Sequence, residues 1–263
     1  MTASFDAELT DEQLDRYARH LVLRGVGGPG QRRLRRASVL VVGAGGLGAP
    51  ILAYLAAAGI GRLAIIDDDR VSLSNLQRQV LFESADIGAP KVTVAKRRLA
   101  ALNPDVEIQA HDARLTAQSA PDFLSGHDLV IDGCDNFATR LTVSDACVGA
   151  GVPLISAALG EFEGQVMGFG PAGGPCYRCF LPAPPPEAAS CERLGVLGAL
   201  AGLIGALAAT EALKLLVDLG EPILGRLLLV DTLNHRQRSI RIPKDPACPA
   251  CGPGALKTGS DDG

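Results

Sequence analysis

Four of the seven cysteines form two C-x-x-C pairs, Cys176/Cys179 and Cys248/Cys251. A random order of seven cysteines in a chain of this length gives about 0.2 such pairs, so the spacing is informative. Four thiolates fill a closed tetrahedral Zn²⁺ site and leave no position for a substrate. The spacing therefore predicts a structural zinc site that joins two segments separated by 68 residues. Redox dithiols and unrelated buried thiols are the alternatives.

A second motif, Gly43-Ala44-Gly45-Gly46-Leu47-Gly48, follows an apolar run and opens a helical pattern. Glycines in a G-x-G-x-x-G loop let the backbone approach phosphates, and the helix N-terminus supplies free N–H groups. Asp67 ends the next apolar run, where a carboxylate can bind ribose hydroxyls. These features predict a nucleotide site, with Gly43, Gly45, Gly46 and Gly48 beside the phosphates.

The residues after Asp67 favour ATP over a nicotinamide dinucleotide. They are more polar than a dinucleotide adenine pocket requires, and they include Asp69, Asn75, Gln77, Arg78 and Gln79. Lys91 lies in the first turn of a predicted helix, where a cation opposes the helix dipole, although a solvated lysine is the alternative. Asp132 and Asp135 follow another apolar run. Carboxylates beside cations suit a triphosphate with Mg²⁺, and the Walker lysine motif is absent.

Alternating strand and helix patterns position these motifs. The patterns predict strands over 38–42, 62–66, 106–110, 128–131 and 153–156, with helices over 47–58, 90–102 and 137–150. Such alternation is typical of a Rossmann-like, doubly wound α/β fold with a parallel sheet. Later strands over 165–169, 226–230 and 238–242 lack intervening short helices, so we expect antiparallel strands in the C-terminal half, the change falling near residue 160.

The N-terminal segment reads as a separate helical arm. Thr10-Asp11-Glu12 is a helix-start signal, and Leu14, Tyr17 and Leu21 recur at helical spacing, which leaves Arg19 off the apolar stripe. We expect the glycines from Gly25 to Gly30 to end this helix. The predicted organisation is an arm over 1–30, a single domain with the zinc site over 31–252, and a disordered tail over 253–263.

The composition and charge of the chain bear on whether it binds nucleic acid or membranes and on where it is located. The chain is 47% hydrophobic and 21% charged, with a net charge of -4, which argues against nucleic-acid and membrane binding. The longest uncharged stretch, 194–210, is too short to span a bilayer and reads as a buried helix. The polar N-terminus is not a secretory signal, and seven cysteines without one indicate a reducing compartment, so we expect a cytoplasmic protein.

The motifs together resemble the ThiF/MoeB/HesA adenylyltransferases, which are bacterial relatives of ubiquitin-activating enzymes. The resemblance runs from about residue 10 to 252, and its most specific part is the run Ser-Asn-Leu-Gln-Arg-Gln at 74–79 with the double cysteine pair. It also includes Arg16–Arg19, the glycine loop, Pro90-Lys91 and Asp132-x-x-Asp135-Asn136.

This resemblance implies a homodimer that binds ATP over the glycine loop. Asp67 would hold the ribose, Asp135 would bind Mg²⁺, and Arg19 would reach the triphosphate of the neighbouring subunit. The remaining residues implied at the nucleotide are Asp69, Asn75, Arg78, Gln79, Lys91 and Asn136.

The implied reaction adenylates the C-terminal glycine of a small ubiquitin-like sulfur carrier that ends in Gly-Gly, in molybdopterin or thiamine-thiazole biosynthesis. Sulfur would come from a separate sulfurtransferase or cysteine desulfurase, since no rhodanese module follows Cys251. Some family members use the position of Cys191 for a covalent link to the carrier, and others do not. Cys134 and Cys147 read as packing residues.

Three other functions stay open at this point. They are a nicotinamide- or flavin-dependent oxidoreductase, a non-catalytic scaffold on the same fold, and ATP-dependent activation of a different substrate such as a tRNA base or a small acid. A scaffold would be expected to lose some of Arg19, Arg78, Lys91 and Asp135, and all four are present.

Overall fold

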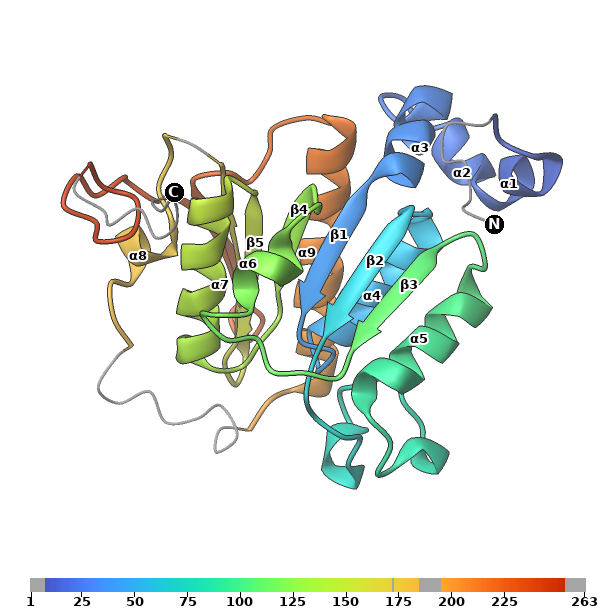
Figure 1. Cartoon of the computed structure of the whole chain (residues 1–263), viewed down its shortest axis with the longest axis horizontal. Helices are drawn as coiled ribbons and strands as arrows, with labels where there is room; N and C mark the ends of the chain where they lie inside the picture. The colour runs from blue at the N-terminus through green and yellow to red at the C-terminus, as the bar shows by residue number, and fades with distance from the viewer. Residues whose placement is uncertain (1–7, 172, 185–194, 254–263) are drawn as a thin grey trace, which may run out of the picture.

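The computed structural model describes residues 8–171, 173–184 and 195–253, and these residues build one sheet of eight strands. The strand order is β3-β2-β1-β4-β5-β6-β7-β8 (Figure 1). The strands are β1 (Ser38–Val42), β2 (Arg62–Ile66), β3 (Glu107–His111), β4 (Leu129–Asp132), β5 (Leu154–Leu159), β6 (Glu163–Phe169), β7 (Arg226–Asp231) and β8 (Arg236–Arg241).

The sheet changes direction where the sequence predicts it. Strands β1 to β5 pair in parallel, and β6, β7 and β8 pair antiparallel. The change falls between Leu159, at the end of β5, and Glu163, at the start of β6. A doubly wound sheet that is parallel in its N-terminal half and antiparallel in its C-terminal half is therefore confirmed. The ends of β1 and β2 match the prediction, and those of the other strands differ from it by at most three residues.

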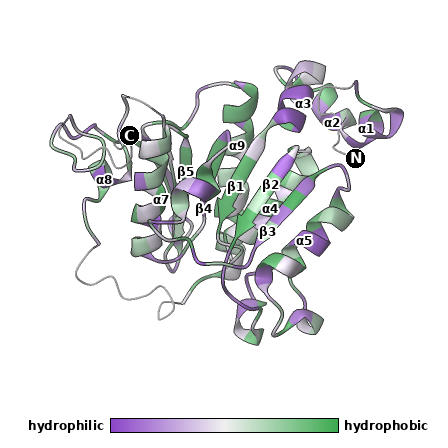
Figure 2. Cartoon of the chain, viewed as in Figure 1, coloured by the Kyte–Doolittle hydropathy of each residue, from purple (hydrophilic) through white to green (hydrophobic). Residues whose placement is uncertain are grey.

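Helices cover both faces of the sheet. One layer holds α4 (Gly48–Ala58), α5 (Lys91–Leu102) and α9 (Gly198–Val217), and the other holds α6 (Ala120–Leu124), α7 (Phe137–Ala150) and α8 (Tyr177–Phe180). Alternate residues of β1 serve the two layers: Val39 and Val41 pack in one core, Leu40 and Val42 in the other. A strand buried on both faces is mostly apolar, which is why Val39–Val42 of β1 form a continuous apolar run (Figure 2).

Helix α9 is the one helix in the described residues that is long and apolar enough to cross a membrane. Half of its most apolar window is buried within the protein, and the helix packs against α4, β5 and β6. A Cβ at Gly205 would lie 2.4 Å from the Pro50 side chain, so α9 and α4 approach closely. These contacts are those of a core helix, as the sequence predicts.

The N-terminal arm differs from the prediction. The structure has α1 (Asp11–Arg16), capped by Thr10, then α2 (Ala18–Leu21) and α3 (Gly27–Arg36). The expected helix end at Gly25–Gly30 is wrong, because the first helices already end at Leu21 and Gly27 begins a new one. Three glycines are tolerated in the first turn of α3, and Gln31 and Leu34 anchor the helix in the core. The predicted boundary at residue 30 falls inside α3.

Two single-turn helices, η1 (Leu73–Asn75) and η2 (Ser84–Asp86), lie in the connection between β2 and α5. The expected disordered tail at 253–263 lies almost wholly outside the described residues, which end at Pro253.

Candidate active site

The glycine loop forms a tight turn at the carboxyl end of β1. Gly43 has φ +93°, which favours glycine, and a Cβ at Gly48 would lie 1.9 Å from the Gly43 carbonyl oxygen. A Cβ at Gly43 would lie 3.2 Å from the Gly133 carbonyl, so the β4–α7 loop is in direct contact with the turn. No larger residue fits at Gly48, so the turn packs directly against the start of α4.

Asp67 fixes this loop from the end of β2. Its Oδ2 accepts a hydrogen bond from the Ala44 amide at 2.7 Å, and its Oδ1 accepts one from the Asp69 amide at 2.8 Å. Burial raises the pKa of the Asp67 carboxyl, while the Lys91 ammonium and the two amides act in the opposite direction. Each oxygen keeps a second lone pair, so the carboxylate can still accept a ribose hydroxyl.

Lys91 is a buried cation and not a solvated lysine. Its side chain is 5% exposed, and its Nζ lies 2.7 Å from Oδ2 of Asp69, a carboxylate that is 67% exposed. The Lys91 amide also donates to the Asp69 carbonyl, which fixes the first turn of α5 against the β2 loop. An ammonium held out of water requires an anionic partner, and in this structure Asp69 supplies it.

The segment around η1 brings Arg78 and Gln79 to the glycine loop. The Arg78 side chain would lie 3.4 Å from a Cβ at Gly46, and the Gln79 side chain 3.6 Å from one at Gly45. Gln79 is 3% exposed, yet its Oε1 has no hydrogen-bond partner among the described residues. The Asn75 carbonyl accepts hydrogen bonds from the amides of both residues and so shapes this turn. This buried amide oxygen is free to accept a hydrogen bond from a donor group of a ligand or from water.

The β4–α7 loop separates two aspartates that the sequence places together. Asp132 is fully buried and accepts a hydrogen bond from the Ser156 hydroxyl, so it faces the core and not the nucleotide site. Asp135 and Asn136 are exposed, and the Asn136 side chain accepts the Thr139 amide as the N-cap of α7. Of the two aspartates, only Asp135 offers an exposed carboxylate for a metal.

The carboxylates of Asp67, Asp68 and Asp69 lie within 4.8 Å of one another, which could suggest a second cation site. Cations of the protein already neutralise two of them. Asp69 pairs with Lys91, and Asp68 pairs with Arg114 at 3.0 Å.

Arg19 lies away from the nucleotide site of its own chain. It is exposed on α2, and the arm packs where the strands begin, whereas the glycine loop follows a strand end (Figure 1). Tyr17 fixes this position, because its hydroxyl accepts a hydrogen bond from Asn103 at the end of α5. Of the residues predicted at the nucleotide, the glycine loop, Asp67, Arg78, Gln79 and the loop that carries Asp135 lie close together, whereas Arg19 lies apart from them.

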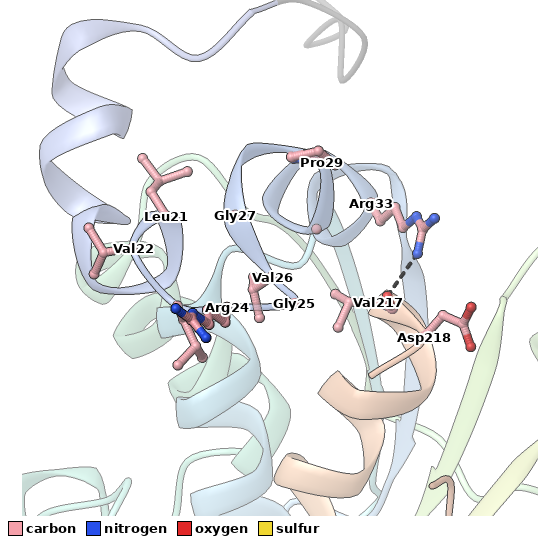
Figure 3. Close-up of a pocket in the computed structure, with 12 residues that line it drawn as sticks. Leu21, Val22, Arg24, Gly25, Val26, Gly27, Pro29, Arg33, Val217 and Asp218 are labelled. Carbon is pink, nitrogen blue, oxygen red and sulfur yellow. Dashed lines mark hydrogen bonds between the residues drawn. The ribbon is translucent and has the colours of Figure 1, made fainter. Parts of the chain in front are cut away.

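A pocket lies between the α2–α3 connection and the end of α9, and none of the predicted site residues lines it (Figure 3). There Arg33 donates a hydrogen bond to the Val217 carbonyl at 2.8 Å. A cation at a helix C-terminus satisfies free carbonyls, so this contact fastens the arm to the core.

The two C-x-x-C pairs come together. Cys176 Sγ lies 3.6 Å from Cys248 Sγ, Cys179 Sγ lies 3.4 Å from Cys251 Sγ, and all four sulfur atoms lie within 4.8 Å of one another. A tetrahedral Zn²⁺ with Zn–S bonds of about 2.3 Å places its sulfurs about 3.8 Å apart. The thiol cluster therefore has the ligand set and spacing of a four-coordinate metal site.

The other cysteines divide into two groups. Burial raises the pKa of the Cys134 and Cys147 thiols, so neither is a ready nucleophile, in agreement with a packing role. Cys191 lies outside the described residues.

The comparisons with known proteins identify the family. The ThiF family model matches residues 17–250, nearly the whole chain. The chain belongs to the ThiF family. It is 50% identical over 250 residues to the sulfur carrier protein adenylyltransferase of Thermus thermophilus, covering 92% of each chain. It is also 45% identical over 263 residues to the SAMP-activating enzyme E1 of Haloferax volcanii, covering 99% of this chain and 96% of that protein.

The fold of this ThiF-family chain also matches solved structures. The crystal structure of E. coli MccB with MccA-N7isoASN superimposes with a TM-score of 0.81 at 25% identity, covering 90% of this chain and 75% of that chain.

Sequence reasoning misses one polar residue of this ThiF-family site. Arg140, on α7, is 4% exposed and donates a hydrogen bond to the Cys134 carbonyl in the β4–α7 loop. The available signal is its position, one helical turn after the Asn136 cap, on the buried face of α7 that also carries Leu141 and Ser144. A charged residue in such a place requires a partner.

Proposed function

We propose that this protein uses ATP to adenylate the C-terminal glycine of a small ubiquitin-like sulfur carrier, in preparation for sulfur transfer. The chain is an adenylyltransferase, as its family and its full-length relatives indicate. The observation that carries the proposal within the structure is that the Arg78 guanidinium side chain borders the glycine loop, while the buried Lys91 ammonium acts on Asp67, which is hydrogen-bonded to that loop. These groups fit a polyphosphate better than a nicotinamide.

In the proposed reaction, the carrier carboxylate attacks the α-phosphorus of ATP, and pyrophosphate leaves with the electrons of the broken P–O bond. The products are an acyl-adenylate and pyrophosphate. Two anions must approach each other, so the fixed charges of Arg78 and Lys91 lower the barrier by electrostatic stabilisation. The glycine loop and Asp67, at the ribose, position the ATP, and this positioning supplies much of the remaining lowering of the barrier. The step requires no side-chain nucleophile.

Mg²⁺ fits beside Asp135 on chemical grounds. This exposed carboxylate has no hydrogen bond or ion pair within the described part of the chain, and its loop touches Gly43. Mg²⁺ commonly takes one or two carboxylates together with phosphate oxygens, whose charge it neutralises. Asp69, Asn75, Gln79 and Asn136 complete the polar surroundings that we assign to the nucleotide.

We further propose a homodimer in which Arg19 acts on the neighbouring subunit. The arm carries Arg19 to the edge of the sheet opposite its own glycine loop, so only a second copy can bring it to a triphosphate (Figure 1). Apolar side chains lie exposed at both places. Val22 is 78% exposed beside Arg19, and Leu73 and Val80, next to Arg78, are 71% and 77% exposed. Burying such residues against a second copy would stabilise a two-fold contact.

The thiol cluster is assigned to structural Zn²⁺, held by Cys176, Cys179, Cys248 and Cys251. Four protein ligands leave no open position for a substrate. We propose a cytoplasmic location, because thiols that hold a metal must stay reduced.

Three further assignments complete the proposal. The carrier ends in Gly-Gly, the sulfur comes from a separate sulfurtransferase or cysteine desulfurase, and the product serves molybdopterin or thiazole synthesis. A covalent link through Cys191 stays a hypothesis; normal sulfur transfer by a Cys191→Ala enzyme would contradict it.

The first test is ATP–pyrophosphate exchange with purified protein and each candidate carrier. We expect exchange with one carrier and none after its terminal glycine is removed. Absence of exchange with every carrier, in a protein that binds ATP and Zn²⁺, would mean that the substrate is wrong. Hydride transfer to or from a nicotinamide would overturn the proposal altogether.

A further inference from the structure

A buried ion pair lies directly below the β4–α7 loop. Asp132, the last residue of β4, is 0% exposed, and Arg140 of α7 is 4% exposed. The Arg140 Nε lies 3.3 Å from Asp132 Oδ2. Burying two charges costs more than burying an apolar pair of similar size, so stability alone does not explain this arrangement. What the two side chains hold is therefore informative.

The pair fixes both polar backbone groups of one residue, Cys134. Its amide donates to Asp132 Oδ1 at 3.0 Å, and its carbonyl accepts a hydrogen bond from Arg140 Nη2 at 2.5 Å. The next residue in the chain is Asp135. The carboxylate assigned to Mg²⁺ thus follows a residue whose amide and carbonyl are both bonded to charged, buried side chains.

The same pair joins this loop to strand β5. Arg140 Nη2 also donates to the Ala157 carbonyl at 3.0 Å, and the Ser156 hydroxyl donates to Asp132 Oδ2 at 2.8 Å. Because β5 pairs with β4 in the centre of the sheet, the loop is tied to the two central strands.

The loop in turn supports the glycine loop. The Gly133 carbonyl lies 3.2 Å from the position of a Cβ at Gly43, and the Gly133 amide donates to the Val42 carbonyl. A displacement of Cys134 would therefore move both Asp135 and the phosphate-binding turn.

On its other side Arg140 lies over a residue next to the thiol cluster. The guanidinium carbon of Arg140 lies 5.8 Å from the centre of the Tyr177 ring, and Tyr177 follows Cys176 in the chain. The Tyr177 amide donates to the Ser144 hydroxyl on α7. Arg140 thus joins the metal-binding segment to the nucleotide edge.

We propose that Arg140 and Asp132 are positioning residues that hold Asp135 and the glycine loop in the geometry that adenylation requires. They act through the backbone of Cys134 and not by touching the substrate. This inference rests on the proposed function, which assigns Asp135 to Mg²⁺.

The test must separate positioning from folding. Arg140→Met alone leaves the Asp132 carboxylate buried without its cation, so this variant is expected to fold poorly. The double variant Arg140→Met/Asp132→Asn removes both charges, and the new amide can still accept the Cys134 N–H and bond to Ser156. Cys147→Ala, which trims a buried side chain farther along α7, is the matched control.

We expect the double variant to melt cooperatively, close to the wild type, but to bind MgATP about 10- to 100-fold more weakly by calorimetry, as for residues that orient a metal ligand. The Mg²⁺ concentration for half-maximal pyrophosphate exchange should rise by a similar factor, with KM for the carrier unchanged. Arg140→Lys keeps the positive charge but lacks the planar guanidinium group. Its MgATP affinity should therefore lie between those of the wild type and the double variant. Cys147→Ala should change neither quantity.

Wild-type MgATP affinity and Mg²⁺ dependence in a folded double variant would overturn the positioning role. A wild-type protein that binds MgATP but shows no exchange with any carrier would overturn the proposed substrate only, because the binding measurement still tests Arg140. A wild type that does not bind MgATP would overturn both.

Discussion

Replacement of Lys91 by methionine separates the catalytic role that we propose for this residue from its structural one. Methionine keeps most of the apolar stem of lysine, and Lys91 is 5% exposed, so packing is largely retained. The partner, Asp69, is 67% exposed and is therefore not left as a buried unpaired charge. The free energy of unfolding should fall by no more than about 1 kcal/mol.

The effect on the reaction should be much larger. Removal of one preorganised group that stabilises developing charge costs about 10²–10³ in kcat, or about 2.7–4 kcal/mol. We expect this loss in pyrophosphate exchange for Lys91→Met. Lys96→Met is the matched control, because Lys96 is exposed on the same helix. A Lys91→Met enzyme with kcat within about threefold of wild type and an unchanged melting temperature would refute the assignment of Lys91 to the phosphates.

The pH dependence of stability gives an independent check. Burial raises the pKa of Asp67, and Lys91 opposes this shift. A carboxyl whose folded-state pKa lies above its unfolded value makes the protein less stable as pH rises between the two values. Without Lys91 the folded-state pKa should rise further and widen that window. The stability deficit of Lys91→Met in urea unfolding should therefore grow from acidic pH, near the ordinary carboxyl range, to neutral pH; a constant deficit would contradict this coupling.

Three further predictions test other parts of the molecule. Gly48→Ala should lower the free energy of unfolding by about 3 kcal/mol, because its Cβ would lie 1.9 Å from the Gly43 oxygen. Gly149→Ala is the control: a Cβ there meets no atom within 4 Å, so this variant should be neutral or slightly stabilising in thermal melts. Cys248→Ala should abolish stoichiometric zinc by elemental analysis and lower the melting temperature by about 10 °C or more, while Cys147→Ala keeps the metal; an unchanged zinc content in Cys248→Ala would contradict the site. Coexpression of Arg19→Ala and Lys91→Met chains should restore about a quarter of wild-type activity through mixed dimers with one intact site, and no recovery would count against action in trans.

The parallel half of the sheet could be predicted because burial leaves a strong pattern. Val39 to Val42 must be apolar on both faces, and the glycine loop and Asp67 follow from the same βα unit. The change of direction after Leu159 could also be predicted, because only three residues join β5 to β6, too few for the crossover that a parallel neighbour requires.

The arm was harder to predict. Glycines usually end helices, yet Gly27 to Gly30 begin α3, because the buried Gln31 and Leu34 fasten it to the core. Tertiary contacts of this kind override local propensity.

At the site, residue types and order do not reveal which charges are buried. Asp132 and Asp135 look equivalent in the sequence, but one ends a central strand and the other lies in a loop. Similarly, the pairing of Lys91 with Asp69 and of Arg140 with Asp132 depends on which strand ends meet in space. Contacts of this kind between distant residues cannot be predicted from the amino-acid sequence alone.

Strand β8 ends the sheet, and this has a consequence for the behaviour of the protein in concentrated solution. All six of its residues are exposed, and three of them are arginines: Arg236, Arg238 and Arg241. If two copies of β8 paired antiparallel about their midpoint, Arg236 of each would face Arg241 of the other. Like charges in directly opposed positions repel each other. Strand β8 therefore resists pairing with the β8 strand of a second copy, which would join two sheets into an aggregate. Charge-reversing substitutions along β8 should remove that protection before they affect the fold.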